Sequence, residues 1–371
     1  MIYLDHAATT PLSPLALSTL LSVAQETTGN PSSIHAAGRQ ANQVLRQARQ
    51  TIARCLQVAD QQILFTSGGS EADTLAIQGY ALANQDKGRH LITTAIEHHA
   101  VLHTMHYLEE RFGFEVTYLQ PINQQISAQQ VRDALRPDTI LVSMMYANNE
   151  TGQLLPIREV GQMLSDHQAV FHVDAVQAIG KLPIFPEEEG IDLLSASAHK
   201  FHGPKGVGFL YSRLPKLDAL IRGGRQEQGY RAGTENLPAI AAMAVALEEA
   251  DQNRKQHTDR LDHLHAHLLD GLTGLSYYHN AAGPHLPHVL NLGFPNQLNE
   301  QLLMRLDLAG IALSSGSACT AGLLQPSHVL AAMYGKDSPR LRESIRISLS
   351  HTTTLDEIDT FLSHLHLILG G

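Results

Sequence analysis

The chain has 371 residues, 43% of them hydrophobic, and a formal net charge of −10. This length exceeds what one hydrophobic core usually serves, so we expect two domains, and the acidic balance argues against a general binder of nucleic-acid phosphates. Two cysteines are too few for a disulfide framework, and there is no secretory leader and no apolar run that could span a membrane; we therefore predict a cytoplasmic protein.

Short apolar segments alternate with helical patterns through the first two thirds of the chain. Helices are predicted from Glu71 to Ala83 and from His98 to Arg111. Repeated strand and helix of this kind predicts an α/β fold with a largely parallel sheet and ligands at the carboxyl ends of the strands. The predicted strands are residues 63–66, 91–96, 115–119, 139–146, 169–174, 192–198 and 206–212.

One long helix, predicted from about Pro238 to Leu272, leads into a second set of elements that includes HVLNLGF and SIRISLS. We assign residues 15–255 to a large domain. Residues 1–14 and 256–371 form a smaller α+β domain in this division.

The turn Ser67-Gly68-Gly69-Ser70-Glu71 lies between a predicted strand and a helix start. Glycines let the backbone approach an anion, and the first amides of a helix can hold a phosphate. A tight turn with a serine cap is the plainer alternative, and the turn alone leaves both open.

Asp174 ends an apolar strand, and Lys200 follows another at SASAHK. A carboxylate at the tip of a buried strand needs a cationic partner. A buried lysine with a lowered pKa is suited to Schiff-base chemistry, and in pyridoxal phosphate enzymes its companion is an aspartate beside the pyridine nitrogen. A solvated lysine would be the simpler interpretation without Asp174 and the glycine turn.

Further polar residues follow the predicted strands. His98 could stack on a cofactor ring and move protons, although without the other motifs a solvent-exposed histidine at a helix start is the simpler interpretation. Asn149 and Gln177 could donate hydrogen bonds to a phenolic oxygen. Arg346, among apolar neighbours, is the candidate for binding a substrate carboxylate.

The stretch SSGSACTAG, residues 314–322, surrounds Cys319 with small residues. Such a segment offers little apolar surface to a packing cysteine, so we predict a loop that carries a reactive thiol. Cys55 fits a helix face as a packing residue. The histidines of HLHAH lack an acidic or cysteine partner pattern, and no metal site is expected there.

Several motifs occur together and in a fixed order. They are YLDHAATTP, GNPSSIHAAGR, FTSGGSEADTLAI, EHHAV, ANNETG, FHVDAVQAIGK, SASAHKFHGPKGVG, RAGTEN and SSGSACTAG. In this order and spacing they resemble the NifS/IscS-like cysteine desulfurases over nearly the whole chain. The lysine of SASAHK and the cysteine of SSGSAC are that family's own markers.

The resemblance implies a fold-type I enzyme of the class V aminotransferase group, with a mostly parallel seven-stranded sheet, pyridoxal 5'-phosphate as cofactor and L-cysteine as substrate. Cys319 would take the substrate sulfur as a persulfide, leaving alanine, and pass it to an acceptor such as an iron–sulfur scaffold protein. A homodimer is also implied. The implied cofactor contacts are Lys200 as the Schiff-base lysine, Asp174 at the ring nitrogen, His98 on the ring, Asn149 and Gln177 at the phenolic oxygen, and Gly69, Ser70, Ser197 and His199 at the phosphate with Thr234 of the neighbouring subunit. Arg346 would bind the substrate carboxylate, assisted by Asn30.

Three alternatives stay open on the sequence. One is a cystine or selenocysteine lyase, or a transaminase, with the same cofactor; the presence of Cys319 favours a desulfurase. Another is a non-catalytic scaffold or binding module, against which Lys200 and Asp174 argue. A Cys–His hydrolase would leave both of those residues unexplained. The chain also stops at LHLILGG, without the extended tail of housekeeping members, so the acceptor is open.

Overall fold

The computed structural model describes residues 1–213, 216–316, 319–320, 323–324 and 326–370, with the backbone only at 319–320 and 323–324. A seven-stranded sheet lies at its centre, in the order β2-β8-β7-β6-β5-β3-β4. Strand β8 runs antiparallel to its neighbours β2 and β7, and the remaining pairs are parallel. This sheet confirms the predicted fold class. Its strands are β2 (Ile63–Thr66), β3 (His90–Thr94), β4 (Glu115–Leu119), β5 (Thr139–Met145), β6 (Val170–Asp174), β7 (Leu193–Ser197) and β8 (Gly208–Ser212).

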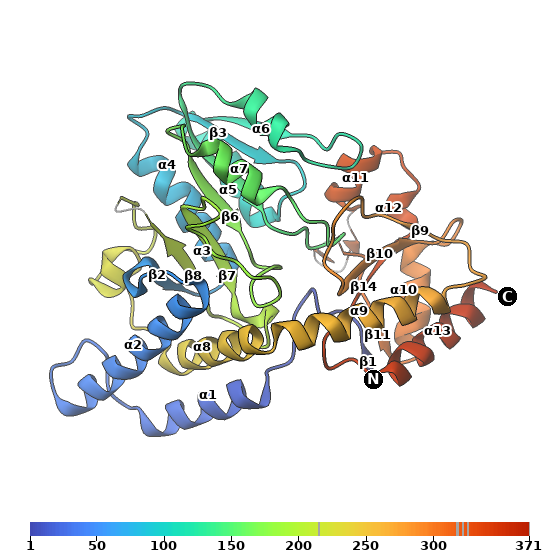
Figure 1. Ribbon diagram of the computed structural model, residues 1–371, viewed down its shortest axis with the longest axis horizontal. Coiled ribbons are helices and arrows are strands. Elements are labelled where there is room, and N and C mark those ends of the chain that lie inside the picture. The colour runs from blue at the N-terminus through green and yellow to red at the C-terminus, as the bar shows by residue number, and fades with distance from the viewer. Residues whose placement is uncertain (214–215, 317–318, 321–322, 325, 371) are drawn as a thin grey trace.

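Helices cover both faces of this sheet (Figure 1). Successive strand residues point to opposite faces, so Val142 packs into one core and Leu141 into the other. The helices on the first face are α1 (Pro14–Glu26), α2 (Ala36–Leu56), α6 (Ala128–Ala134), α7 (Ile157–Leu164) and α8 (Leu237–Gln252). The second face carries α3 (Gly69–Thr74), the π-helical turn Leu75–Gly79, α4 (Tyr80–Ala83) and α5 (His99–Phe112).

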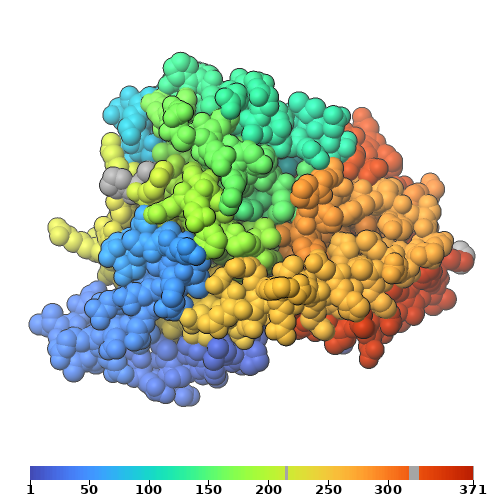
Figure 2. Space-filling model, viewed as in Figure 1, coloured from blue at the N-terminus to red at the C-terminus, as the bar shows by residue number. Residues whose placement is uncertain are grey.

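The predicted long helix after Pro238 is in fact two helices. Helix α8 ends at Gln252, Asn253 leaves helical geometry with φ −99° and ψ 6°, and α9 (Arg254–Gly271) continues from there. The Asn253 amide Nδ2 donates to Glu249 O at 2.8 Å, so the side chain satisfies one of the last carbonyls of α8. The two helices form a continuous ridge along the surface (Figure 2).

A separate apolar core lies among Leu4 and residues 261–365. It packs around a three-stranded sheet, β14-β10-β9, and a two-stranded parallel pair of β1 and β11. On this basis we propose the two-domain division given above. The elements are β1 (Ile2–Tyr3), β9 (Tyr278–His279), β10 (Val289–Gly293), α10 (Asn299–Leu308), β11 (Ile311–Ala312), α11 (His328–Tyr334), α12 (Arg340–Glu343), β14 (Ser344–Ser348) and α13 (Leu355–Leu369).

Short 3₁₀ turns lie at Asp60–Gln62, Ala198–Lys200 and Gln226–Gly229. Backbone pairing also joins β12 (Cys319–Thr320) to β13 (Leu323–Leu324), where the sequence predicts a loop. Among the described helices none combines the length and apolarity that crossing a membrane requires.

Candidate active site

A cavity of about 430 Å³ opens at the carboxyl ends of the central strands, against the separate core around β10 and β14. Parallel strands deliver the residues that follow them to one edge of a sheet, which is why motifs far apart in the sequence meet here. Ten predicted site residues line this cavity: Gly69, Ser70, His98, Asn149, Asp174, Gln177, Ser197, His199, Lys200 and Arg346.

Lys200 ends a single 3₁₀ turn after β7 and reaches back to the N-terminal segment. Its Nζ donates to Ala7 O at 2.7 Å and to Ala8 O at 2.8 Å. Burial, with the nearby Arg346 charge, lowers the pKa of the Lys200 amine to about 8. A lysine in this environment can be neutral near physiological pH, which nucleophilic amine chemistry needs.

Asp174 ends β6, and one of its carboxylate oxygens accepts a hydrogen bond from Val176 N at 3.0 Å. Burial raises the pKa of Asp174 to about 6, although Lys200 opposes the shift. The described residues give Asp174 no ion-pair partner. Asp73, from α3, lines the same cavity, and burial together with Asp174 raises its pKa. The two carboxyl groups therefore give this wall an affinity for a cationic or proton-donating ring.

The glycine turn forms the neighbouring part of the cavity wall. A Cβ at Gly69 would lie 2.8 Å from Val176 Cγ2, so a side chain cannot be accommodated without displacing Val176. Ser197 follows at the end of β7, and a Cβ at Gly68 would meet its hydroxyl at 3.6 Å. Next to it, His199 Nδ1 lies 3.1 Å from Thr9 Oγ1. The backbone of the turn thus lies beside hydroxyls and an imidazole, a suitable set for a phosphate.

His98 caps α5, as the predicted helix start requires, and its Nδ1 accepts from Ala100 N at 3.1 Å. The imidazole is exposed toward the cavity. The surrounding protein and, secondly, the Lys200 charge lower its pKa. A neutral ring in this position can stack on a planar ligand.

Arg346 lies on β14, beside the separate apolar core, and extends into the cavity, where its side chain is nearly inaccessible to solvent. Its Nη2 donates to Asp5 Oδ1 at 2.7 Å, and its Nη1 donates to Asn149 O at 2.8 Å. The Arg346 Nε has no partner among the described residues. One edge of the guanidinium is held by protein, and a donor remains for a ligand carboxylate.

Both described ends of the Cys319 segment are fastened to the cavity wall. Arg346 N donates to Ser314 O at 2.6 Å before it, and the hydroxyl of Ser327 donates to Glu150 after it. A Cβ at Gly316 would also lie 3.4 Å from Glu150 Cβ. Three residues of chain span at most about 11 Å, so the Cys319 backbone lies within that distance of Gly316 at the cavity wall.

The cavity of the single chain does not include Asn30 or Thr234. Both side chains are exposed, and Asn30 Oδ1 accepts from Ser32 N at 2.9 Å. Their roles stay predictions, since only a second subunit could bring Thr234 to a cavity. The Cys319 side chain lies outside the described part of the structure.

Some residues of this site were not anticipated from the sequence. The carbonyls of Ala7 and Ala8 hold Lys200, Asp5 holds Arg346, and Glu150 fastens the Cys319 segment. Asp5 and Glu150 stand in the motifs YLDHAATTP and ANNETG, so strand-end carboxylates were visible there. Their partners belong to distant parts of the chain, which no local pattern reveals.

The residues of the cavity fit pyridoxal 5'-phosphate. Gln177 is buried, donates through Nε2 to Ala7 O at 3.0 Å, and leaves its Oε1 without a partner among the described residues. A buried unpaired amide oxygen calls for a ligand hydrogen-bond donor, so Gln177 would accept from a phenolic O–H, whereas the sequence predicts that it donates. Asp174 would face the pyridine nitrogen, the glycine turn would hold the phosphate, and Lys200 offers an amine of lowered pKa.

The titration of Lys200 gives a first prediction. We expect the rate of covalent reaction of the cofactor-free protein with pyridoxal phosphate to rise with pH through about 8 and then level off, because the neutral amine reacts. An ordinary lysine would keep gaining reactivity up to its usual pKa of about 10.4. Stopped-flow absorbance over a pH series measures this, and a rate still rising at that higher pH would contradict the lowered pKa.

Comparison with known proteins places these residues in a broader context. The aminotransferase class-V family profile matches residues 2–361. A Bacillus subtilis protein named as a candidate cysteine desulfurase IscS 1 is 50% identical over 369 residues, covering 98% of this chain and 97% of that protein. Cysteine desulfurase IscS of Methanosarcina thermophila is 43% identical, with 97% and 90% covered. A solved NifS-like protein superposes with TM-score 0.93 at 36% identity, covering 100% of this chain and 99% of its own.

Proposed function

We propose a function from the premise that the chain belongs to the aminotransferase class-V family, in which it is a pyridoxal-phosphate-dependent cysteine desulfurase. The enzyme removes sulfur from L-cysteine and leaves L-alanine. The observation that carries the residue assignment is the tethering of both ends of the Cys319 segment to the cavity that holds Lys200, Asp174 and Arg346.

Bound pyridoxal phosphate draws electrons from the substrate Cα and so makes the Cα–H bond acidic. Asp174 would stabilise the protonated ring nitrogen, and His98 would cover the ring face. Gln177 and Asn149 would contact the phenolic oxygen. The phosphate would be held by Gly69, Ser70, Ser197 and His199, together with Thr234 of a neighbouring subunit.

Lys200 would move the proton. Its amine is held between the Ala7 and Ala8 carbonyls, at the wall of the cavity. The lowered pKa lets Nζ accept a proton from the substrate Cα and return it to the product, since a catalytic base works best with a pKa near the working pH.

Arg346 would bind the substrate carboxylate and fix the orientation of cysteine, with Asn30 assisting. We expect Arg346→Gln to raise KM for L-cysteine by about 30-fold or more, since losing one charge-assisted contact typically costs about 2 kcal/mol or more. Steady-state assays of alanine formation measure this. Asp5→Asn is the matched control: it keeps the guanidinium but removes the carboxylate that orients it, so a smaller rise in KM is expected. Equal KM for Arg346→Gln and the unmodified enzyme would contradict the assignment.

Cys319 would act last. Its thiolate attacks the substrate sulfur, so a sulfur–sulfur bond forms while the carbon–sulfur bond breaks, and the freed carbon is protonated to give alanine. The persulfide on Cys319 then carries the sulfur to an acceptor.

We further propose a cytoplasmic homodimer that delivers sulfur to an acceptor such as an iron–sulfur scaffold protein. Thr234 and Asn30 lie exposed and outside the cavity of one chain. Leu15, Leu17 and Leu21 of α1 are about half exposed, and a second subunit could cover them.

The substrate is supported by a related structure. A solved structure described as SspA in complex with cysteine superposes with TM-score 0.85 at 36% identity and covers 95% of this chain, which supports cysteine as the substrate here.

The decisive experiment is the intact mass of the protein, and of its Cys319 peptide, after brief exposure to L-cysteine without reductant. A gain of one sulfur atom on that peptide, with alanine in solution, is the expected result. Pyruvate, ammonia and free sulfide with an unmodified Cys319 would instead indicate the lyase alternative.

A further inference from the structure

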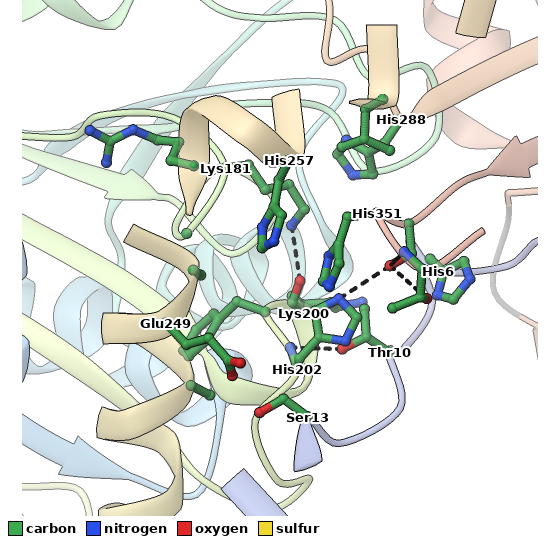
Figure 3. Close-up of a pocket in the computed structure, with 18 of the residues that line it drawn as sticks. His6, Thr10, Ser13, Lys181, Lys200, His202, Glu249, His257, His288 and His351 are labelled. Carbon is green, nitrogen blue, oxygen red and sulfur yellow. Dashed lines mark hydrogen bonds between the residues drawn. The ribbon is translucent and has the colours of Figure 1, made fainter. Parts of the chain in front are cut away.

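A second, smaller pocket of about 170 Å³ lies behind Lys200, between the two parts of the molecule (Figure 3). It is formed by the N-terminal segment 6–14, the α8–α9 junction, and the chain around residues 286–288 and 349–352. Lys200 lines both this pocket and the catalytic cavity. We call it the rear pocket. None of the roles assigned above involves it.

Histidine side chains are concentrated around the rear pocket. The ring of His288 is 2% exposed, and neither of its nitrogens has a hydrogen-bond partner among the described residues. Nδ1 of His6, also buried, is likewise unpartnered within the described chain. A buried unpaired N–H costs free energy that a bound acceptor would recover. The other histidines lining the pocket are His202, His257 and His351.

These other rings have partners and fix the shape of the pocket. Nδ1 of His202 lies 2.9 Å from Pro11 O, and the rings of His257 and His351 stack with centroids 3.8 Å apart. Stacked rings cannot direct their nitrogens at a common ion. Among the described residues no group of three or more potential metal ligands comes together, here or elsewhere. The histidines therefore do not form a metal centre.

The positive charge of Lys181, next to His288, also favours an anion. Lys181 lines the pocket, and its Nζ donates to Gln177 O and to Lys200 O, both at 3.0 Å. In its protonated form the Lys181 ammonium has three N–H donors, so these bonds leave one for a ligand. Two further charged residues line the pocket, Glu249 and Arg254. The carboxylate of Glu249 lies well apart from His288 in Figure 3, and Arg254 is paired with Asp251.

We propose that the rear pocket binds a small organic carboxylate, with its anionic group at His288 and Lys181 and its apolar body against Phe201, Leu261 and Leu286. These apolar side chains are buried and line the pocket beside the histidines. The volume holds only a compact molecule, and the mixed lining suits one with a charged end and an apolar end.

Protonation couples to this binding. Burial and the Lys181 charge lower the pKa of His288, and burial with the neighbouring histidines lowers the pKa of His351 to about 3. His6 and His202 are shifted down in the same way, while Glu249 opposes the shift at His257. Burial and the Lys200 charge also lower the pKa of Lys181, to about 7. A bound anion raises these pKa values again, so binding takes up protons and tightens as the pH falls through about 7.

Lys200 is the link to catalysis. Its carbonyl accepts from Lys181 beside the rear pocket, whereas its amine lies at the catalytic cavity. A ligand at Lys181 would therefore bind next to a side chain that is hydrogen-bonded to the backbone of the reactive lysine.

The test is calorimetric titration of the cofactor-loaded enzyme with benzoate, and with benzamide as an uncharged control of the same shape. We expect saturable binding of benzoate only, with proton uptake seen as different apparent enthalpies in two buffers. Because Arg346 could also attract a carboxylate, the titration is repeated with Arg346→Gln, which should bind benzoate unchanged. Loss of binding in that variant would assign the ligand to the catalytic cavity and overturn the proposal.

His288→Leu is the diagnostic variant. Removing an unpartnered buried ring should leave the unfolding temperature unchanged or raised, while the affinity for benzoate falls at least about 10-fold. Lys181→Met serves as a second variant, with the same expected loss of affinity, should His288→Leu fail to fold. No saturable binding by the unmodified enzyme, or equal affinities in the unmodified enzyme and these variants, would mean that the pocket holds only water. None of these readouts measures turnover, so they are independent of the desulfurase assignment.

Discussion

Lys200→Ala is expected to lower alanine formation from L-cysteine by at least about 10³-fold, within the range that a single proton-transferring group contributes. The substitution removes the amine held by Ala7 O and Ala8 O, and with it the group placed to move the substrate Cα proton. No other lysine lines the catalytic cavity among the described residues, so no neighbour can substitute.

The loss should be chemical and not structural. The backbone of Lys200 would still accept from Lys181, and the 3₁₀ turn Ala198–Lys200 keeps its own hydrogen bonds. Circular dichroism and the unfolding temperature should therefore stay close to those of the unmodified protein.

Lys205→Ala is the matched control, since Lys205 lies five residues further along the same loop, is exposed, and is absent from the catalytic cavity. Its rate should match that of the unmodified enzyme. If Lys200→Ala retained a tenth or more of the activity, by order of magnitude, the role of Lys200 as proton carrier would be wrong, because proton transfer contributes about 10² or more.

Cys319→Ser should abolish the persulfide and lower sulfur transfer on the order of 10³-fold or more, as removal of a covalent nucleophile typically does. Serine keeps the size of the side chain but is a far weaker nucleophile toward sulfur. L-Cysteine should still bind, because Arg346 and the rest of the cavity are untouched. Substrate binding by difference absorbance and persulfide by peptide mass separate the two effects.

Cys55→Ser provides the control, because the chain has two cysteines. Cys55 is partly buried on α2, and burial with the Asp251 and Glu248 charges raises the pKa of its thiol to about 12. A thiol of this kind is a poor nucleophile, so the variant should transfer sulfur at the normal rate. Full activity in Cys319→Ser, or loss of persulfide in Cys55→Ser, would contradict the assignment to Cys319.

The sequence by itself determined the alternation of strand and helix, the order of the strands along the chain, and the residues that follow them. Strand periodicity and helix caps are local, so the helix beginning after His98 and the strand ending at Asp174 follow from their own neighbours. A buried strand end with a charged residue is an unfavourable arrangement without a ligand, which is why Asp174 and Lys200 stood out as candidates.

Only the tertiary structure decided which residues act on these candidates. Packing between distant segments places the carbonyls of Ala7 and Ala8 at Lys200. It also brings Asp5 to Arg346, 341 positions away, and Ser327 to Glu150. The rear pocket is the clearest case: His6, Lys181, His288 and His351 are scattered along the sequence with no common pattern. Burial and electrostatic coupling arise when distant segments of the chain pack together. A histidine therefore becomes a binding group only through the neighbours that the fold supplies.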